Sequence, residues 1–534
     1  MNDIQSSHST ITSVRGRDLP YPADTGPRHA RSDNAADFSL AFPCREGDPS
    51  TADLRSNQGN SMTTAVTVDA VRLASGKGKP GGTLSGTHPV ETLAHVLRAV
   101  VDRNDLDPAL IDDVIGGCVQ QVGEQALNIS RTATLATGFP ESAPATTIDR
   151  QCGSSQQAAH FAAAGVVADA YDIVIACGVE SMSRVPMGTS PIGQYTAGPS
   201  IAARYPQGLV NRGISAELIA AKWKLDRETL DAFSAESHRR ASHAAANGLL
   251  EAEILPIAVR DKEADLVPHQ VDETVRAATT AHGLSGLKSL FRNAQYAQRF
   301  PEIGWHITPG NSSPLTDGAS AVLIMSEQAA TKLGLTPRAR FHSFAVADAD
   351  PLFMLTAPIP ATKKVLAKSG LSIDDIDAYE VNEAFAPVPL MWAHEFGADP
   401  ARLNPRGGAI ALGHALGSSG TRLLTTLVNQ LEATGGRYGL QTMCESAGLA
   451  NATVIERLKC RTRSALISAD GLEPGFADLS RPRASNPITR PFPRGRHRCN
   501  TTSTKPIMRR TGRRSANFSP AKLSRTTNGG RMSG

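Results

Sequence analysis

The sequence lacks long hydrophobic runs. No segment of its 534 residues approaches the roughly 18 consecutive apolar residues that a membrane-spanning helix requires. Its 40% hydrophobic and 20% charged residues are the composition of a soluble globular protein. Residues 1–62 contain several acids and no apolar stretch of a signal peptide, and the chain ends in Arg-Met-Ser-Gly, which is not a peroxisomal signal. We therefore expect a cytoplasmic protein without a membrane partner.

Cysteine is also scarce. The seven cysteines are too few for a disulfide framework at this length, and no Cys-x-x-Cys pair indicates a zinc site. The sequence therefore predicts free thiols in a reducing compartment and no metal.

Positive charge is concentrated in one segment. Residues 461–534 hold 16 Lys and Arg against three acids, so this tail carries +13; the rest of the chain therefore carries about −9, the overall +4 less that +13. A mildly acidic body gives no reason to expect nucleic-acid binding, and the tail lacks the periodic apolar residues of a recognition module. We expect no specific nucleic-acid partner.

The hydrophobic pattern divides the chain into four parts. Residues 1–62 and 460–534 have no helical or strand periodicity, which predicts disorder at both ends. Between them, strands and helices alternate in two series of similar order, 63–336 and 337–459, which indicates an internally duplicated, layered α/β fold. An irregular stretch at about 183–305, interrupted by Pro and Gly, is typical of a large insertion within the first series.

Periodicity also places individual elements. The expected strands are 65–71, 114–118, 146–150, 172–178, 317–326 and 378–381. The expected helices are 88–102, 128–137, 152–168, 215–247 and 361–369, with another beginning at Ala384 and one that follows a Gly-rich turn at 407–420.

Cys152 stands at a predicted corner between a strand and a helix. The unpaired N–H groups and the dipole at a helix N-terminus favour a thiolate and can donate hydrogen bonds to an oxyanion. The position therefore suits a nucleophile. The alternative is a structural thiol, because free cysteine is among the most buried residue types.

His414 is the one histidine in a run of small residues, 407–420, before a predicted helix. Neither Gly-x-Gly-x-x-Gly nor Gly-Lys-Ser/Thr is present, which argues against a phosphate loop. Small neighbours let a substrate approach the imidazole closely, as a base acting on a thiol requires, although a structural histidine fits the pattern equally well.

Two further residues are ambiguous when each is considered alone. Cys444 lies in a polar kink between expected strands, where a thiol matters only if a proton must be exchanged with carbon. Asn382 follows a strand, where an Asn side chain often caps a helix. Each has a purely structural interpretation.

These residues gain weight from the motifs that contain them. Segments 150–155 (Arg-Gln-Cys-Gly-Ser-Ser), 382–385 (Asn-Glu-Ala-Phe), 413–414 (Gly-His) and 444–446 (Cys-Glu-Ser) occur in an order and spacing that resemble the thiolase family. The resemblance covers about residues 63–458. Further similar segments are 178–183, 310–313, 317–319 and 358–361.

The resemblance implies a fold and a set of roles. The fold would consist of two βαβαβαββ halves packed in five layers, with the insertion as a loop domain that holds coenzyme A. Cys152 would be the acylated nucleophile, His414 its activator and Cys444 the acid/base for the α-carbon. Asn382 would position a water in an oxyanion hole.

The resemblance also implies substrates. Acyl-CoA and CoA would be the substrates, with no other cofactor, in a homodimer or homotetramer. Ser313, Pro309 and Gly310 would line the pantetheine, Arg276 would reach the nucleotide end, and Met187 would border the acyl-thioester pocket.

The sequence departs from the family pattern at three places. Ala415 follows the histidine where Pro is usual, Ala357 precedes Pro358 where Gly is usual, and Ser446 and Ala447 replace a Gly-rich stretch after Cys444. A Cβ at position 446 is expected to strain that turn or crowd the pantetheine.

The sequence therefore predicts a thiolase that cleaves 3-ketoacyl-CoA with CoA, or condenses the products in reverse, through a Cys152 acyl-enzyme. Two other interpretations remain. A ketoacyl synthase has a similar fold but no second cysteine in its pattern, so Cys444 argues against it. An acyl-CoA-binding protein with little turnover is supported only by Ser446 and Ala447.

Overall fold

The computed structural model describes residues 63–261 and 263–458. The disorder predicted for residues 1–62 and 460–534 concerns segments outside the described residues.

The first half of the chain forms one five-stranded part of a sheet, in the order β4-β3-β5-β9-β1. β3 is parallel to β4 and β5, whereas β9 is antiparallel to both β5 and β1. The elements in chain order are β1 (Ala65–Leu73), α1 (Pro89–Asp102), β3 (Asp113–Gly117), α2 (Ile129–Ala136), β4 (Ala145–Ile148), α3 (Ser154–Val167), β5 (Ile173–Ser181) and β9 (Thr316–Ser326).

The second half repeats this topology with one reduction. Its strands have the order β11-β12-β13-β10, and the strand that would match β4 is a single parallel bridge between Tyr379 and Leu403. The predicted duplication is therefore present in the element order. The elements are β10 (Ala339–Asp348), α10 (Pro358–Ser369), β11 (Ala378–Val381), α11 (Pro387–Phe396), α13 (Ser419–Thr434), β12 (Tyr438–Cys444) and β13 (Leu449–Arg457).

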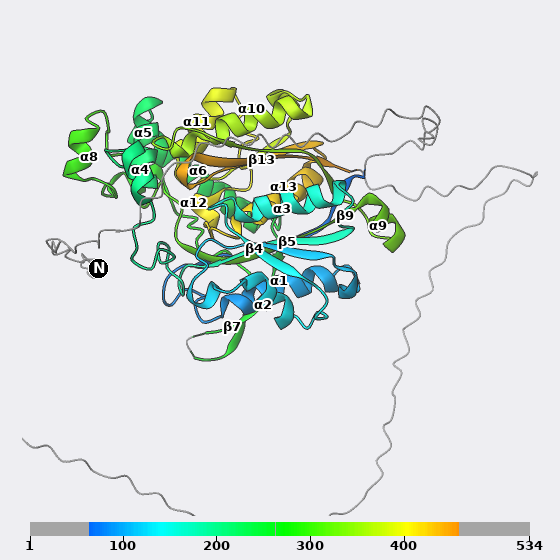
Figure 1. Ribbon diagram of the computed structural model, residues 1–534. Helices are drawn as coiled ribbons and strands as arrows, with labels where there is room; N and C mark the ends of the chain where they lie inside the picture. The colour runs from blue at the N-terminus through cyan, green and yellow to red at the C-terminus, as the bar shows by residue number, and fades with distance from the viewer. Residues whose placement is uncertain (1–62, 262, 459–534) are drawn as a thin grey trace, which may run out of the picture. The chain divides into compact units, whose positions relative to one another are not determined.

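The two halves stack in five layers (Figure 1). α1 and α2 cover one face of the first half's strands, α3 and α13 lie between the two sets of strands, and α10 and α11 form the opposite outer layer. β1 and β10 pair at Val66 and Arg340, so the nine strands named above form one continuous sheet, which β2 (Gly76–Lys77) and β6 (Ile254–Leu255) extend to 11 strands.

The central helix α3 is buried on almost every side because strands lie both above and below it. Four alanines, at positions 158, 159, 162 and 163, are at most 1% exposed. A helix that is apolar and small all round fits between layers, where a bulky residue would force them apart. His160 of α3 bonds Thr453 Oγ1 of β13 at 2.7 Å and stacks on Phe344 of β10, which ties the two halves together.

The insertion lies between β5 and β9. It contains α4 (Gly198–Arg204), α5 (Arg212–Lys222), α6 (Arg227–Ala246), β6 (Ile254–Leu255), β7 (Ile257–Arg260), β8 (Leu266–His269), α7 (Ala281–Ser285) and α8 (Ala294–Arg299). The helix expected over 215–247 is in fact two helices, because Asp226 caps a new helix by accepting from the Thr229 N–H. The helix expected from Ala384 begins at Pro387.

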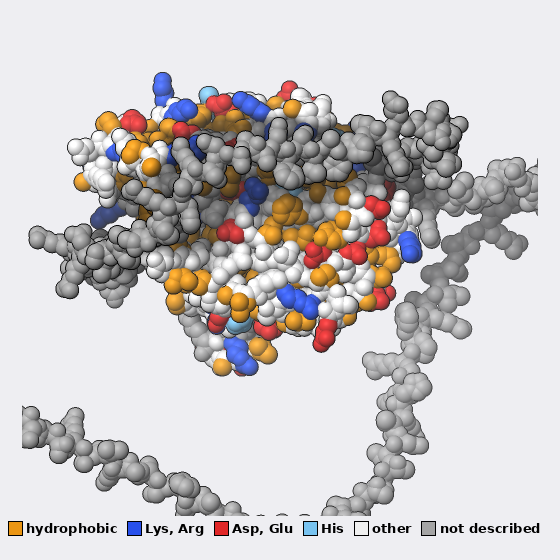
Figure 2. Space-filling model, in the orientation of Figure 1, with side chains coloured by type: hydrophobic (Ala, Val, Ile, Leu, Met, Phe, Trp, Pro, Cys, Tyr) orange, Lys and Arg blue, Asp and Glu red, His pale blue; other side chains and the backbone are white. Residues whose placement is uncertain are grey.

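Within the described residues, no helix is long and apolar enough to span a membrane. Figure 2 shows acidic, basic and hydrophobic side chains interspersed on the visible face, so no basic patch dominates the described part of that face.

Candidate active site

Cys152 lies at the tight corner that joins β4 to α3. Gln151 has a φ of 49°, an unusual value for a residue other than glycine, and the Ser154 hydroxyl fixes the turn. That hydroxyl accepts from the Arg150 N–H at 2.9 Å and donates to the Gln151 carbonyl at 2.6 Å. Backbone strain of this kind costs about 1–3 kcal/mol and is concentrated at functional sites. The corner holds the thiol at 4% exposure.

The imidazole of His414 is held as a base. Its Nδ1 lies 2.7 Å from Ser419 Oγ, and that hydroxyl donates its own proton to the Ala415 carbonyl at 2.8 Å. Ser419 Oγ must therefore accept from Nδ1–H, which leaves the lone pair on Nε2. Asn382 Nδ2 faces Nε2 at 3.4 Å as a donor. The hydrogen bonds thus select the tautomer in which Nε2 can take a proton.

Asn382 and Cys444 come together because β11 and β12 are parallel neighbours. Asn382 follows β11 and its N–H donates to Thr442 O at 3.1 Å, while Cys444 is the last residue of β12. Each side chain is 1% exposed. Asn382 Oδ1 is buried and has no hydrogen-bond partner among the described residues. One sheet edge therefore presents an amide and a thiol to the same space.

Burial keeps the free site neutral. It raises the pKa of the Cys152 thiol to about 11, against the lowering effect of Arg212. The pKa of His414 falls to about 3, through burial first and the charges of Arg422 and Arg212 second. The sequence-based expectation that the helix N-terminus favours a thiolate is thus wrong for the free site, because desolvation outweighs it.

The second thiol is close to the first. Burial raises the pKa of Cys444 well above its ordinary value, and a charge on Cys152 raises it further. Glu445 is fully buried, and burial raises the pKa of its carboxyl well above the ordinary value. The carboxyl lies so close to Gly153 that it would clash with a side chain at that position. The thiols, the imidazole and this carboxyl are all therefore favoured in uncharged forms.

The turn after Cys444 is strained at a different residue from the one expected. Ala447 has a φ of 64° and Gly448 a φ of 90°, whereas Ser446 is absent from the described residues with positive φ. The predicted strain at Ser446 is therefore wrong, since the left-handed position falls on Ala447. The Ser446 hydroxyl instead accepts from Arg212 Nη1 at 3.2 Å.

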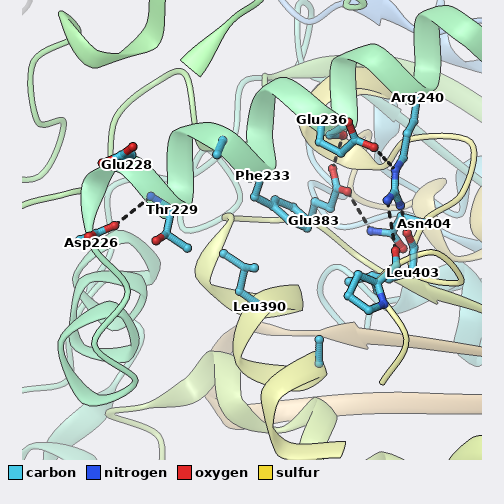
Figure 3. Close-up of a pocket in the computed structure, with 14 residues that line it drawn as sticks. Asp226, Glu228, Thr229, Phe233, Glu236, Arg240, Glu383, Leu390, Leu403 and Asn404 are labelled. Atoms are coloured by element: carbon cyan, nitrogen blue, oxygen red, sulfur yellow. Dashed lines mark hydrogen bonds and ion pairs between the residues drawn. The ribbon is translucent and has the colours of Figure 1, made fainter. Parts of the chain in front are cut away.

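Glu383 holds the backbone next to Asn382 in place. It points into a cavity of about 560 Å³ that contains none of the four candidate side chains (Figure 3). Its carboxylate accepts from Ser237 Oγ at 2.7 Å, Asn404 Nδ2 at 2.8 Å and the Ile410 N–H at 3.1 Å. These bonds join α6, β11 and the turn before His414, so they fix the backbone that presents Asn382.

The predicted CoA residues fall in two places. Arg276, Pro309 and Gly310 line one small cavity together with Ser312. Ser313 lies next to this cavity, and its N–H and Oγ both donate to the Ala384 carbonyl at 3.1 Å.

Met187 lies elsewhere. It is 41% exposed and its Sδ accepts from Arg212 Nη2 at 2.9 Å. Met187 therefore belongs to the surroundings of Ser446 and Cys444.

Two residues of this site were not singled out from the sequence. Ser419 lies within the Gly-rich run at 407–420, where only the fold reveals that it bonds His414. Arg212 has a visible signal, a cation at the first position of a helix that follows the capping residue Asn211. Cations are unfavourable at that end of a helix, which marks the position as unusual.

The fold agrees with the comparisons to known proteins. Residues 65–328 match the model of the thiolase N-terminal domain, and residues 335–457 match the model of the thiolase C-terminal domain. The chain belongs to the thiolase family.

Relatives match over almost their whole length. A steroid 3-ketoacyl-CoA thiolase, FadA6, of Mycobacterium tuberculosis is 46% identical over 409 residues, which are 75% of this chain and 96% of the relative. A 3-ketoacyl-CoA thiolase of Aliivibrio salmonicida is 42% identical over 400 residues, which are 74% of this chain and 100% of the relative. The crystal structure of the Bacillus anthracis acetyl-CoA acetyltransferase is 34% identical, with a TM-score of 0.67 over 75% of this chain and 100% of that one.

Proposed function

We propose that this acyltransferase of the thiolase type cleaves 3-ketoacyl-CoA with CoA, or condenses the products, using Cys152, His414, Cys444 and Asn382. One observation carries the proposal. Ser419 holds Nδ1 of His414 so that Nε2, with its lone pair, faces Asn382, while Cys444 lies within electrostatic range of Cys152.

The first half-reaction begins from neutral groups. His414 Nε2 takes the Cys152 proton as the sulfur adds to the 3-keto carbon, so no free thiolate need accumulate. The C2–C3 bond then breaks, its electron pair passes to C2, and the Cys444 thiol protonates C2 to release acetyl-CoA. The Cys152 acyl thioester and the Cys444 thiolate remain.

In the second half-reaction CoA resolves the acyl-enzyme. Its thiol loses a proton to the Cys444 thiolate and attacks the thioester carbonyl, and the departing Cys152 sulfur recovers its proton from His414. Donors that face each carbonyl oxygen lower both barriers. The buried, unpartnered Oδ1 of Asn382 supports its proposed role, because that atom can hold a water that donates to an oxyanion.

The CoA site is proposed on more limited grounds. Arg276, Pro309 and Gly310 line a hollow of about 20 Å³ at the insertion, and Ser313 lies beside it; since that volume holds no more than about one water, pantetheine would pass over these residues rather than into the hollow. We propose CoA as a substrate with no other cofactor, a cytoplasmic location, and a homodimer or homotetramer.

The test is a panel of 3-ketoacyl-CoA substrates assayed for CoA-dependent thiolysis by product mass, with the intact protein weighed after exposure to each substrate without CoA. We expect acetyl-CoA and a shortened acyl-CoA, and an acyl adduct on Cys152. Binding without any product or adduct would instead support the acyl-CoA-binding alternative.

A further inference from the structure

Arg212 brings a positive charge into an otherwise neutral site. Its guanidinium donates to Ser446 Oγ at 3.2 Å, two residues beyond Cys444, and to Met187 Sδ at 2.9 Å. Its charge lowers the pKa of Cys152, His414 and Cys444. The cation therefore lies within electrostatic reach of all three groups.

The partners of Arg212 are weak ones for a guanidinium. A thioether sulfur is a poor acceptor and a serine hydroxyl is neutral, whereas a guanidinium has five N–H donors suited to a carboxylate. Among the described residues, no Asp or Glu forms an ion pair with Arg212. Most of its arginine neighbours in the insertion, by contrast, are bound to carboxylates or backbone carbonyls, as Arg227, Arg240 and Arg299 are.

The position of Arg212 at the start of α5 adds to the positive electrostatic potential there. Arg212 occupies the first turn of α5, which contains no acidic residue. The unpaired N–H groups and the helix dipole there carry partial positive charge, so a cation at this point is locally unfavourable and an anion is favoured. A side chain that breaks a local rule at the rim of an active site indicates a functional demand.

We infer that Arg212 selects 3-ketoacyl-CoA substrates whose acyl group carries a carboxylate, by pairing its guanidinium with that carboxylate beside Ser446 and Met187. The inference rests on the proposed thiolase chemistry of the same site. Since the cation lies on the Cys444 side and the proposed pantetheine residues lie at another cavity, the acyl group is the part of the substrate that reaches it.

The test compares substrates of matched length on the full chain. 3-Oxohexanoyl-CoA is paired with 3-oxoadipyl-CoA, which has a carboxylate in place of the terminal methyl group, and 3-oxooctanoyl-CoA is paired with 3-oxosuberyl-CoA. We expect the native chain to prefer the carboxylated member of at least one pair in kcat/KM. Arg212→Met should reduce the ratio of kcat/KM for that member to kcat/KM for its neutral partner roughly 10- to 100-fold, as expected for a lost charge-assisted contact; the ratio cancels any effect that the charge has on Cys152, His414 and Cys444.

Further variants isolate the cause. Arg212→Lys should recover only part of the preference, because it keeps the charge without the bidentate fork. Arg204→Met removes the same charge from α4, where Arg204 contacts the Tyr205 ring, and should leave the preference unchanged. Rising salt should weaken the preference of the native chain.

Two results would overturn the inference. The first is that the native chain cleaves the neutral substrates but does not prefer the carboxylated member of either pair. The second is an equal loss for both members of a pair in Arg212→Met, which would place the guanidinium on CoA or on the reacting carbonyl. Failure of every substrate, neutral and anionic, would instead reject the proposed thiolase function.

Discussion

In the first half of the chain, β4 leads through a tight corner into α3 and places Cys152 there. At the matching place in the second half, the strand is reduced to the bridged residue Leu403, and a long Gly-rich turn leads into α13 and places His414 there. Both side chains precede the N-terminus of a central helix. The duplication therefore supplies two equivalent positions, and the chain fills one with the proposed nucleophile and the other with its proposed base.

The loops that follow β5 and β12 differ more between the two halves than the corners before the central helices do. β12 ends at Cys444 and returns to β13 through a short turn at 445–448, whereas β5 ends at Ser181 and is followed by the whole insertion before β9. The short turn follows the second thiol directly, and the long insertion carries Arg212 and the residues of the proposed CoA site. One topology thus separates the proposed proton donor from the proposed substrate contacts.

The largest effect should come from replacing Cys152, at the corner between β4 and α3. Cys152→Ala should reduce thiolysis by at least roughly 10⁴-fold and eliminate the acyl adduct, because no other cysteine in the described part of the chain lies at such a corner between a strand and a helix. Cys177→Ala, which removes a buried thiol from β5, should keep activity and serves as the control. An adduct that persists in Cys152→Ala would move the nucleophile to another residue.

The proposed role of Cys444, in the second half, should be separable by mutation from that of Cys152. Cys444→Ser should still accept an acyl group from a thioester donor, but should lose carbon–carbon cleavage and α-proton exchange with deuterated solvent by roughly 10²–10⁴-fold. His414→Ala should instead slow the acylation step. Near-normal exchange in Cys444→Ser would assign proton transfer to Glu445 or to a bound water.

The insertion should affect binding more than chemistry. Replacing Ser313 with Leu should raise KM for CoA substrates severalfold with a smaller change in kcat, as expected when ground-state binding is lost. Steady-state kinetics with saturating cosubstrate measure the split. A fall in kcat alone would place Ser313 in the chemistry.

The contact that His160 makes between the two halves should make the stability of the fold depend on pH in the acid range. Burial lowers the pKa of His160 to about 3, so between that value and the ordinary 6.5 the unfolded chain binds a proton that the folded chain does not. Stability should therefore fall as pH drops below about 6.5. Thermal unfolding across this range should show a shallower slope for His160→Gln. An unchanged slope would mean that other buried histidines, such as His238 and His414, dominate.

The smallest effect concerns the short turn. Ala447→Gly should relieve a left-handed backbone and raise the unfolding temperature by about 1 °C, since the gain is at most about 1 kcal/mol. Ala450→Gly in β13 should have the opposite sign. A lower unfolding temperature for Ala447→Gly would show that the turn is not strained.

Local patterns predicted most of the elements. The strand predicted over 378–381 has the bounds of β11, and those predicted over 65–71 and 317–326 agree with β1 and β9 to within a few residues. These segments are determined by periodicity, which depends only on near neighbours in the chain. The helix over 215–247 was wrongly continuous, because Asp226 caps a new helix there.

The sequence by itself predicted the family and the duplicated layers, since short motifs and hydrophobic period are local, and it selected the four residues proposed for the site. Only the tertiary structure decided the protonation states. Burial depends on what the other half places around Cys152 and His414, and it reverses the preference that the helix N-terminus gives the thiol. It also decided which atom of His414 is basic and where Arg212 lies, because Ser419, Ser446 and Met187 meet these groups only when segments far apart in sequence pack together.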